Sequence, residues 1–134
     1  MPELPEVETV RTGLASSWTG KRVDGLELRR EGLRFPFPDD LENRLVGTRI
    51  VKVRRRAKYL LIDLDSGEVL LSHLGMSGRW TLDSSDSEGK HDHVVVHLDD
   101  GTMSVYNDPR RFGMLDIYDG ESHKLLDHLG PEPL

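Results

Sequence analysis

Two turn signals in the middle of the sequence constrain the fold more than any other feature. Asp65-Ser66-Gly67 and Asp99-Asp100-Gly101 each separate two short apolar segments. Aspartate and glycine favour the backbone conformations that close a β-hairpin. The strands that these turns join are predicted at residues 59–64, 68–74, 93–98 and 102–106. Short strands with closely spaced turns are typical of an antiparallel β-sandwich or barrel.

The other segments add further strands and helices. Val7, Val10, Leu14 and Trp18 recur every three or four residues, which predicts a long amphipathic helix that ends at Gly20. Further strands are predicted at residues 22–30, 48–53, 79–82 and 112–118, and short helices at 39–46 and 121–129. We therefore expect a mainly β fold with flanking helices: a two-sheet antiparallel β-sandwich of seven or eight strands with a long N-terminal α-helix.

Composition limits the class of protein. A length of 134 residues suits a single domain at 1–134, and the lack of cysteine excludes disulfides and thiolate zinc sites within it. No apolar run approaches the ~20 residues that span a bilayer, and no signal peptide precedes the acidic start, so we expect a soluble, cytoplasmic protein. Residues 130–134 resemble a linker, which suggests a domain boundary.

The net charge of −6 argues against a nucleic-acid partner, but the charges are segregated along the chain. Five cations fall within residues 52–58, and Arg110 and Arg111 form a second cluster. Acidic residues gather at 83–92 and 116–127. This distribution permits one basic face on an acidic molecule, although a basic strand is more often only a solvated surface.

The first residues carry a candidate nucleophile. Once Met1 is removed, Pro2 has a free secondary amine, and because an α-amino group has a pKa of about 8, part of it is neutral near pH 7. A neutral amine can attack an electrophilic carbon and form an imine or iminium. Glu3 and Glu6 place two carboxylates nearby for proton transfer. Proline and acidic residues are also ordinary at a helix start, so these residues alone leave both interpretations open.

Six blocks of sequence together resemble one protein family. They are PELPEVET at 2–9, RRAKYLL at 55–61, SHLGMSG at 72–78, KHDHV at 90–94, NDPRRFG at 107–113 and LGPEPL at 129–134. In this order they resemble the N-terminal domain of bacterial formamidopyrimidine-DNA glycosylase, an enzyme that excises 8-oxoguanine and ring-opened purines and then cleaves the strand. The related endonuclease VIII family also begins with Pro-Glu, but residues 4–9, Met76 and residues 110–112 favour the first family.

The resemblance implies a bifunctional DNA glycosylase and abasic-site (AP) lyase of base-excision repair. Pro2 would attack C1′ of the damaged nucleotide and form a Schiff base, and β,δ-elimination would then release both phosphates. Glu3 would donate the proton that opens the deoxyribose ring, with Glu6 as a supporting carboxylate. Lys58 would transfer a proton during elimination or bind a phosphate.

The same resemblance implies that three side chains enter the DNA when a nucleotide is flipped out. Met76 and Phe112 would fill the space in the base stack, and the Arg110 guanidinium would bind the orphan cytosine. Without the resemblance, Met76 and Phe112 would more simply be a turn or core methionine and a strand residue facing the core.

Contacts to the DNA backbone are also implied. His73 and His91 match family positions that contact backbone phosphates, and Arg111 would bind a phosphate or support its loop. His93 and His97 alternate with valines on a predicted strand, so we assign them structural roles.

Full-length members of the family carry a second, helical domain and a four-cysteine zinc finger, both absent from this chain. Zinc is therefore expected in that missing region, and no cofactor is expected here. Residues that hold the lesion's phosphates are missing with it, so we expect this chain alone to bind DNA weakly and to have little or no glycosylase activity. The expected partner is double-stranded DNA with oxidised purines or abasic sites, and the full-length protein is expected to be a monomer.

Two other functions compete with the enzyme: a non-catalytic DNA-damage binding module and a plain β-sandwich scaffold. A pure binding module has no need of Pro2, Glu3 and Lys58 together. A scaffold has no need of the intercalating set. The presence of both sets favours the enzyme.

Overall fold

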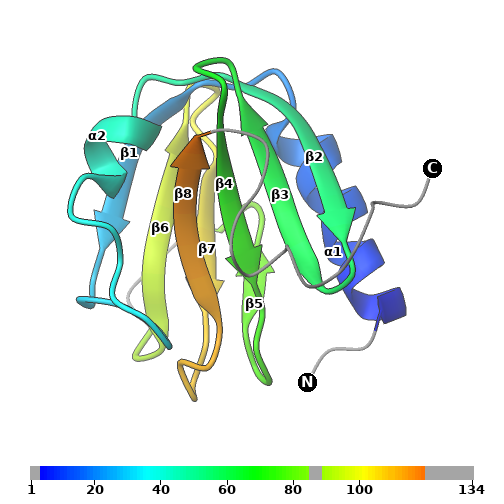
Figure 1. Cartoon of the computed structure of the whole chain (residues 1–134), viewed down its shortest axis with the longest axis vertical. Coiled ribbons are helices and arrows are strands. Elements are labelled where there is room, and N and C mark those ends of the chain that lie inside the picture. Colours follow the sequence, from blue (N-terminus) through cyan, green and yellow to red (C-terminus); the bar gives the residue numbers. More distant parts are fainter. Residues whose placement is uncertain (1–3, 85–88, 120–134) are drawn as a thin grey trace.

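The computed structural model describes residues 4–84 and 89–119. Its strands are β1 (Val23–Leu28), β2 (Ile50–Arg56), β3 (Tyr59–Leu64), β4 (Glu68–His73), β5 (Arg79–Thr81), β6 (Asp92–Leu98), β7 (Met103–Asn107) and β8 (Met114–Asp119). They form two four-stranded antiparallel sheets, with the orders β1-β6-β7-β5 and β2-β3-β4-β8 (Figure 1). The predicted mainly β, two-sheet sandwich is confirmed.

The alternation of side chains along the strands fills the space between the two sheets. In β3, Leu60, Ile62 and Leu64 join the main core, whereas Leu61 points to the other face. There Leu61 packs with Leu71 and other residues of the same sheet in a second, smaller cluster. The period of two that places successive side chains on opposite faces explains both clusters.

Helix α1 (Leu4–Trp18) closes one side of the sandwich and lies beside β2 (Figure 1). Val7, Leu14 and Trp18 are buried, as their spacing predicts. Trp18 reaches the other sheet, where its Nε1 donates to Ser104 Oγ at 2.9 Å and its ring meets the Trp80 ring edge-on. The helix therefore joins the two sheets as well as covering them.

Helix α2 (Leu41–Leu45) covers the opposite side, where it packs against β1 and β8. Leu41 and Leu45 are buried, and Arg44 Nε donates to Glu68 Oε2 at 2.6 Å. The two helices thus shield the gaps between the sheets at both lateral edges. Neither of them is long and apolar enough to cross a membrane, and these are the helices of the described part of the chain.

Some element boundaries differ from those predicted. β2 begins at Ile50 instead of residue 48, because Thr48 Oγ1 donates to Leu45 O at 2.7 Å and holds residue 48 at the end of α2. β8 begins at Met114 instead of residue 112, which leaves Phe112 in the preceding loop. The predicted helix at 121–129 and residues 85–88, part of the acidic segment at 83–92, lie outside the described residues.

The strand registers bring five connections to one end of the sandwich. Tyr59 pairs with His73, and His73 pairs with Met114. In the other sheet, Asn107 pairs with both Asp92 and Arg79. We call this the loop end; it comprises residues 29–34, 57–58, 74–78, 89–91 and 108–113.

Helix α1 also begins at the loop end. Glu8 contacts Arg55 near the end of β2, whereas Gly20, just after the helix, donates its N–H to Ile50 O at the start of β2. The helix therefore runs antiparallel to β2, and its N-terminal turns are next to the turn at 57–58. Segments that lie far apart in sequence converge at this one end.

Replacing Leu14 with alanine should lower the free energy of unfolding by about 2–5 kcal/mol, because the removed methyl groups leave a cavity under α1. Leu14 is fully buried and belongs to the main core cluster. The exposed Ser16 on the same helix is the control, and Ser16→Ala should change stability by less than about 0.5 kcal/mol. Urea denaturation measures both values, and equal effects would contradict the packing described.

Candidate nucleic-acid interface

Met76, Arg110 and Phe112 meet at the loop end. Met76 and Phe112 are 47% and 45% exposed, which is unusual for large apolar side chains. The Arg110 Cζ lies 5.1 Å from the centroid of the Phe112 ring, and Arg110 Nη1 lies 3.9 Å from Met76 Sδ. Two loops therefore present one exposed cluster of two apolar groups and a cation, which we call the wedge cluster.

A pocket of about 420 Å³ adjoins the wedge cluster, and it is lined by Arg34, His73, Gly75, Met76 and Phe112. His73 Nδ1 accepts a hydrogen bond from Gly75 N at 3.0 Å, so the neutral ring carries its proton on Nε2. The Tyr59 ring packs on the His73 ring, with centroids 4.8 Å apart, and restrains its orientation. His73 thus offers a fixed N–H donor at the loop end.

Burial and the nearby cations Lys58 and Arg34 hold the pKa of His73 below its usual value. The ring is therefore neutral at pH 7. Because the charge of Lys58 lowers the pKa of His73, the two side chains interact electrostatically. Lys58 lies in the two-residue turn between β2 and β3, after Ala57, whose φ of 51° is in the left-handed region.

The buried carboxylate of Asp108 holds the loop at 108–113 in shape. Its Oδ1 accepts from Ser77 Oγ at 2.8 Å and from Arg111 N at 3.0 Å. Its Oδ2 accepts from Gly113 N at 2.9 Å and from Tyr106 Oη at 3.0 Å. Burial and this carboxylate raise the pKa of Tyr106 far above its usual value, which keeps the phenol a donor. The Asp108 side chain therefore fixes the backbone at Arg111 and Gly113, on both sides of Phe112.

Gly75 explains why the two loops can lie so close together. Its φ is 61°, and a Cβ atom there would come within 2.5 Å of Gly113 N and Phe112 C. Only glycine fits this backbone conformation and this contact without a shift of the neighbouring loop. The SHLGMSG and NDPRRFG blocks therefore pack directly on each other.

The histidines divide between this loop and the sheet. The carbonyl oxygen of His91 accepts from Asp108 N at 3.0 Å, which places His91 beside the loop at 108–113. The buried His93 donates from Nε2 to Asp108 O at 2.8 Å, and His97 Nε2 lies 2.6 Å from Glu27 Oε2. These contacts agree with structural roles for His93 and His97.

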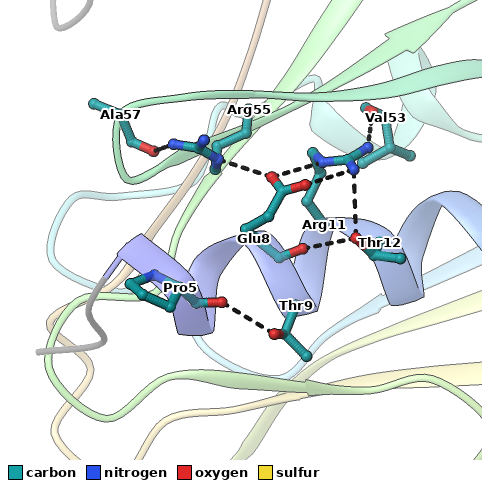
Figure 2. A network of polar contacts seen from close by, with 8 residues as sticks. All are labelled: Pro5, Glu8, Thr9, Arg11, Thr12, Val53, Arg55 and Ala57. Atoms are coloured by element: carbon teal, nitrogen blue, oxygen red, sulfur yellow. Dashed lines mark hydrogen bonds and ion pairs between the residues drawn. The ribbon is translucent and has the colours of Figure 1, made fainter.

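Pro2 and Glu3 lie outside the described residues, so their roles stay predictions. Glu6 is exposed in the first turn of α1. Two residues further on, Glu8 begins a network that links α1 to the turn of Lys58, as Figure 2 shows. The beginning of α1 and Lys58 are thereby held at the same end of the molecule.

The Glu8 carboxylate lies at the centre of this network, between Arg55 and Arg11 (Figure 2). Arg55 Nε donates to Glu8 Oε1 at 2.9 Å, and Arg55 Nη1 donates to Ala57 O at 3.0 Å. Arg11 donates to both Glu8 oxygens, at 2.9 and 2.7 Å. The hydrogen bond from Arg11, and to a smaller extent that from Arg55, lowers the pKa of Glu8 to about 2. The Glu8 carboxylate is therefore ionised at neutral pH.

The same contacts weaken the basic face that the sequence suggests for residues 52–58. Arg54 pairs with Asp63 across the hairpin, and Arg55 pairs with Glu8. At least two of the five cations in this run are therefore opposed by carboxylates. The run contributes to holding the fold together as well as to the surface charge.

Arg34, which lines the pocket together with Met76 and Phe112, was not predicted as a site residue from the sequence. Its backbone N–H donates to Gly113 O at 3.0 Å, which ties its loop to the wedge loop. From the sequence, Arg34-Phe35-Pro36-Phe37-Pro38 indicates only a stiff, extended connection. The signal that could have identified Arg34 is a third group of cations at residues 29–34. Within residues 4–84 and 89–119, no three His, Asp or Glu side chains are grouped to hold a metal ion.

The sequence is similar to that of known proteins over its whole length. Residues 1–115 match the sequence profile described as the formamidopyrimidine-DNA glycosylase N-terminal domain. The chain belongs to the formamidopyrimidine-DNA glycosylase family. Relatives named formamidopyrimidine-DNA glycosylase from Ruegeria sp. (strain TM1040) and Rhizobium etli are 53% identical over 147 residues and 52% identical over 152 residues. These matches cover 100% and 99% of this chain but 52% and 51% of the relatives, so the chain spans about half their length.

Solved structures of the glycosylase family share the fold. The Lactococcus lactis enzyme in complex with DNA containing an abasic site has a TM-score of 0.80 and 31% identity, over 95% of this chain and 47% of that chain. MutM in complex with DNA containing carbocyclic 8-oxoguanine has a TM-score of 0.77 and 33% identity, over 87% and 44%. Both of these similar proteins are bound to DNA.

Replacing Asp108 with asparagine should lower the free energy of unfolding by about 2–4 kcal/mol. The reason is that the amide NH₂ would face hydroxyl or backbone N–H donors that bond to a carboxylate oxygen in the unmodified chain. Hydrogen exchange at the Arg111 and Gly113 amides should also become faster. The control is Asp24→Asn, which removes an exposed carboxylate paired with Arg22 and should cost less than about 1 kcal/mol. A similar cost for both variants would contradict the role of Asp108.

Replacing Lys58 with methionine should raise the pKa of His73, because one of the cations that disfavour the protonated ring is removed. An NMR titration of the histidine rings measures this shift. Lys52→Met, which removes an exposed cation on β2, is the matched control and should leave the pKa of His73 unchanged.

In the unmodified chain, His73 should lower the free energy of unfolding as the pH falls below about 6.5, since its ring takes up a proton more readily in the unfolded state than in the folded state.

Proposed function

We propose that this chain is the catalytic N-terminal domain of a bifunctional DNA glycosylase and AP lyase in base-excision repair. Its substrate would be double-stranded DNA that contains oxidised purines, such as 8-oxoguanine and formamidopyrimidines, or abasic sites. The observation that carries the proposal is the wedge cluster of Met76, Arg110 and Phe112, exposed together above a pocket. The names of the relatives and the DNA in the similar structures support it.

The wedge cluster suits a duplex from which one nucleotide has been flipped out. Flipping costs a few kcal/mol of unstacking and leaves a gap opposite an orphan base. The Met76 side chain and the Phe112 ring are of the size and polarity to fill such a gap. The Arg110 guanidinium, already stacked on Phe112, can donate to the acceptors of the orphan base. Because Asp108 fixes the loop in advance, insertion carries only a small cost in ordering entropy.

The proposed chemistry begins at the amine of Pro2, after removal of Met1. The nitrogen lone pair attacks C1′ as the glycosidic bond breaks; the base leaves with the bonding electrons and takes up a proton, and the nitrogen loses the proton that it carried. Glu3 protonates the ring oxygen O4′, so that the sugar opens and an iminium forms between Pro2 and C1′. Glu6, exposed one turn further along, is proposed as a supporting carboxylate.

Elimination follows from the iminium, which acidifies the proton on C2′. A base removes that proton, and the electrons expel the 3′ phosphate; a second elimination expels the 5′ phosphate. We assign proton transfer or phosphate binding in these steps to Lys58, which the Arg55–Glu8 network holds at the end where α1 begins. His73 and His91 are proposed as phosphate contacts, and the neutral His73 ring supplies an N–H donor.

Borohydride trapping tests this proposal. The chain, without Met1, is mixed at low salt with duplex DNA containing an abasic site, and the mixture is reduced. A covalent adduct is expected, because borohydride converts an iminium into a stable amine, and mass spectrometry of peptides should place the adduct on Pro2. The yield should be lower than with the full-length Ruegeria relative, since this chain spans only about half of that protein.

A variant with one extra residue before Pro2 is the matched control, because its nitrogen is then a tertiary amide and cannot attack. It should give no adduct while it keeps the same DNA affinity. Binding without an adduct from the unblocked chain would instead favour a damage-binding module. Neither binding nor adduct would favour a scaffold without DNA function.

A further inference from the structure

A second groove lies beside the wedge pocket. It has a volume of about 530 Å³ and is lined by Arg29, Arg30, Glu31, Gly32, Leu33, Arg34, Pro36 and Arg111. Arg34 lines both this groove and the wedge pocket, so the two are adjacent. The groove is formed by two loops, at 29–34 and 108–113, that are far apart in sequence. We call it the arginine groove.

The arginine groove concentrates positive charge. Its described lining contains four guanidinium groups and one carboxylate, that of Glu31. Arg29 has a partner in Glu27, with 3.4 Å between Arg29 Nη2 and Glu27 Oε1. In the described part of the chain, the side chains of Arg30 and Arg111 make no ion pair. This contrasts with residues 54 and 55, whose guanidinium groups are opposed by Asp63 and Glu8.

The backbone beneath these cations is held in place. Phe37 N donates to Glu31 O at 2.9 Å and Leu33 N donates to Phe35 O at 3.0 Å, which closes the loop at 29–37 on itself. Phe37 is buried and anchors this loop in the core. On the other side, Arg111 has a φ of 54° and its N–H donates to Asp108. A groove with a fixed backbone loses little entropy when it binds a ligand.

The chemistry of the lining indicates a phosphodiester as the ligand. Guanidinium groups match the oxygens of a phosphate geometrically and are less strongly hydrated than ammonium groups. The shared Arg34 joins this anion site to an exposed apolar cluster, and a nucleic acid carries regularly spaced anions next to planar bases. Contacts of this kind position a duplex without reading its sequence.

We propose that Arg30, Arg34 and Arg111 bind a backbone phosphate of the DNA strand that flanks the wedge cluster. This inference rests on the proposed function, because it takes the DNA as the molecule that enters the wedge pocket. It adds residues 30 and 34 to the interface and extends the DNA-binding surface onto the connection between β1 and α2. The added affinity would not depend on base sequence or on damage.

Fluorescence anisotropy with a labelled duplex, measured as a function of salt, tests the proposal. Arg30→Gln should weaken binding roughly threefold to tenfold at low salt. It should also reduce the slope of log K against log salt by about 1, because the variant neutralises one phosphate fewer. The effect should be the same for undamaged and abasic duplexes. Arg30 is exposed, so the variant should remain folded, and a thermal melt checks this.

Arg22→Gln is the matched control, because it removes the same charge from the other end of β1. Arg22 is exposed and pairs with Asp24. It should leave the salt slope unchanged. As a second readout, binding is measured for duplexes in which a single backbone phosphate is replaced by a neutral methylphosphonate. At one position near the lesion, this replacement should weaken binding to the unmodified chain but should not weaken binding to the Arg30→Gln variant.

The proposal that the arginine groove binds a phosphate would be wrong if Arg30→Gln and Arg22→Gln had the same salt slope and no methylphosphonate position affected only the unmodified chain. That result would leave the trapped adduct, and hence the proposed function, unaffected. Conversely, a slope change at Arg30 without any adduct on Pro2 would support the groove and contradict the lyase.

Discussion

The candidate interface depends on the hydrogen bonds that the buried carboxylate of Asp108 accepts. A buried charge is tolerated only when hydrogen bonds replace its hydration, and Asp108 has four such bonds, from two side chains and two backbone N–H groups. They clamp the loop at 108–113 to β7 and to the loop after β4. The exposed Arg110 and Phe112 are therefore held in position by a fully buried residue.

The charges of the chain have two distinct uses. Some arginines are paired and act as structural links; Arg55 joins α1 to the turn of Lys58 through Glu8, and Arg44 joins α2 to β4 through Glu68. Others gather at the loop end, where Arg34 and Arg111 flank the wedge cluster. A chain of net charge −6 can thus present a local group of cations, because several of its described carboxylates, such as Glu8, Asp63 and Glu68, are opposed by arginines in ion pairs. Net charge alone would have hidden this separation.

Much of the fold could be predicted because its signals are local. The period of α1, the two hairpin turns with glycine and the alternation in β3 each follow from residues close together in sequence. The boundaries failed where a tertiary contact decided them: Thr48 bonds to α2 and delays β2, and Asp108 keeps Phe112 out of β8. Of the site, the family motifs indicated Met76, Arg110 and Phe112, but Arg34 was missed because its partner Gly113 is 79 positions away.

The sequence by itself determined the fold class, the amphipathic helix and the residue types available for chemistry, since these depend on periodicity, turn propensity and motif. Tertiary structure alone decided which of those residues share a surface. Strand register brought 57–58, 74–78 and 108–113 to one end, and ion pairing decided which arginines remained for a ligand. The physical reason is that register and pairing are set by contacts between distant segments, whose energies no local pattern records.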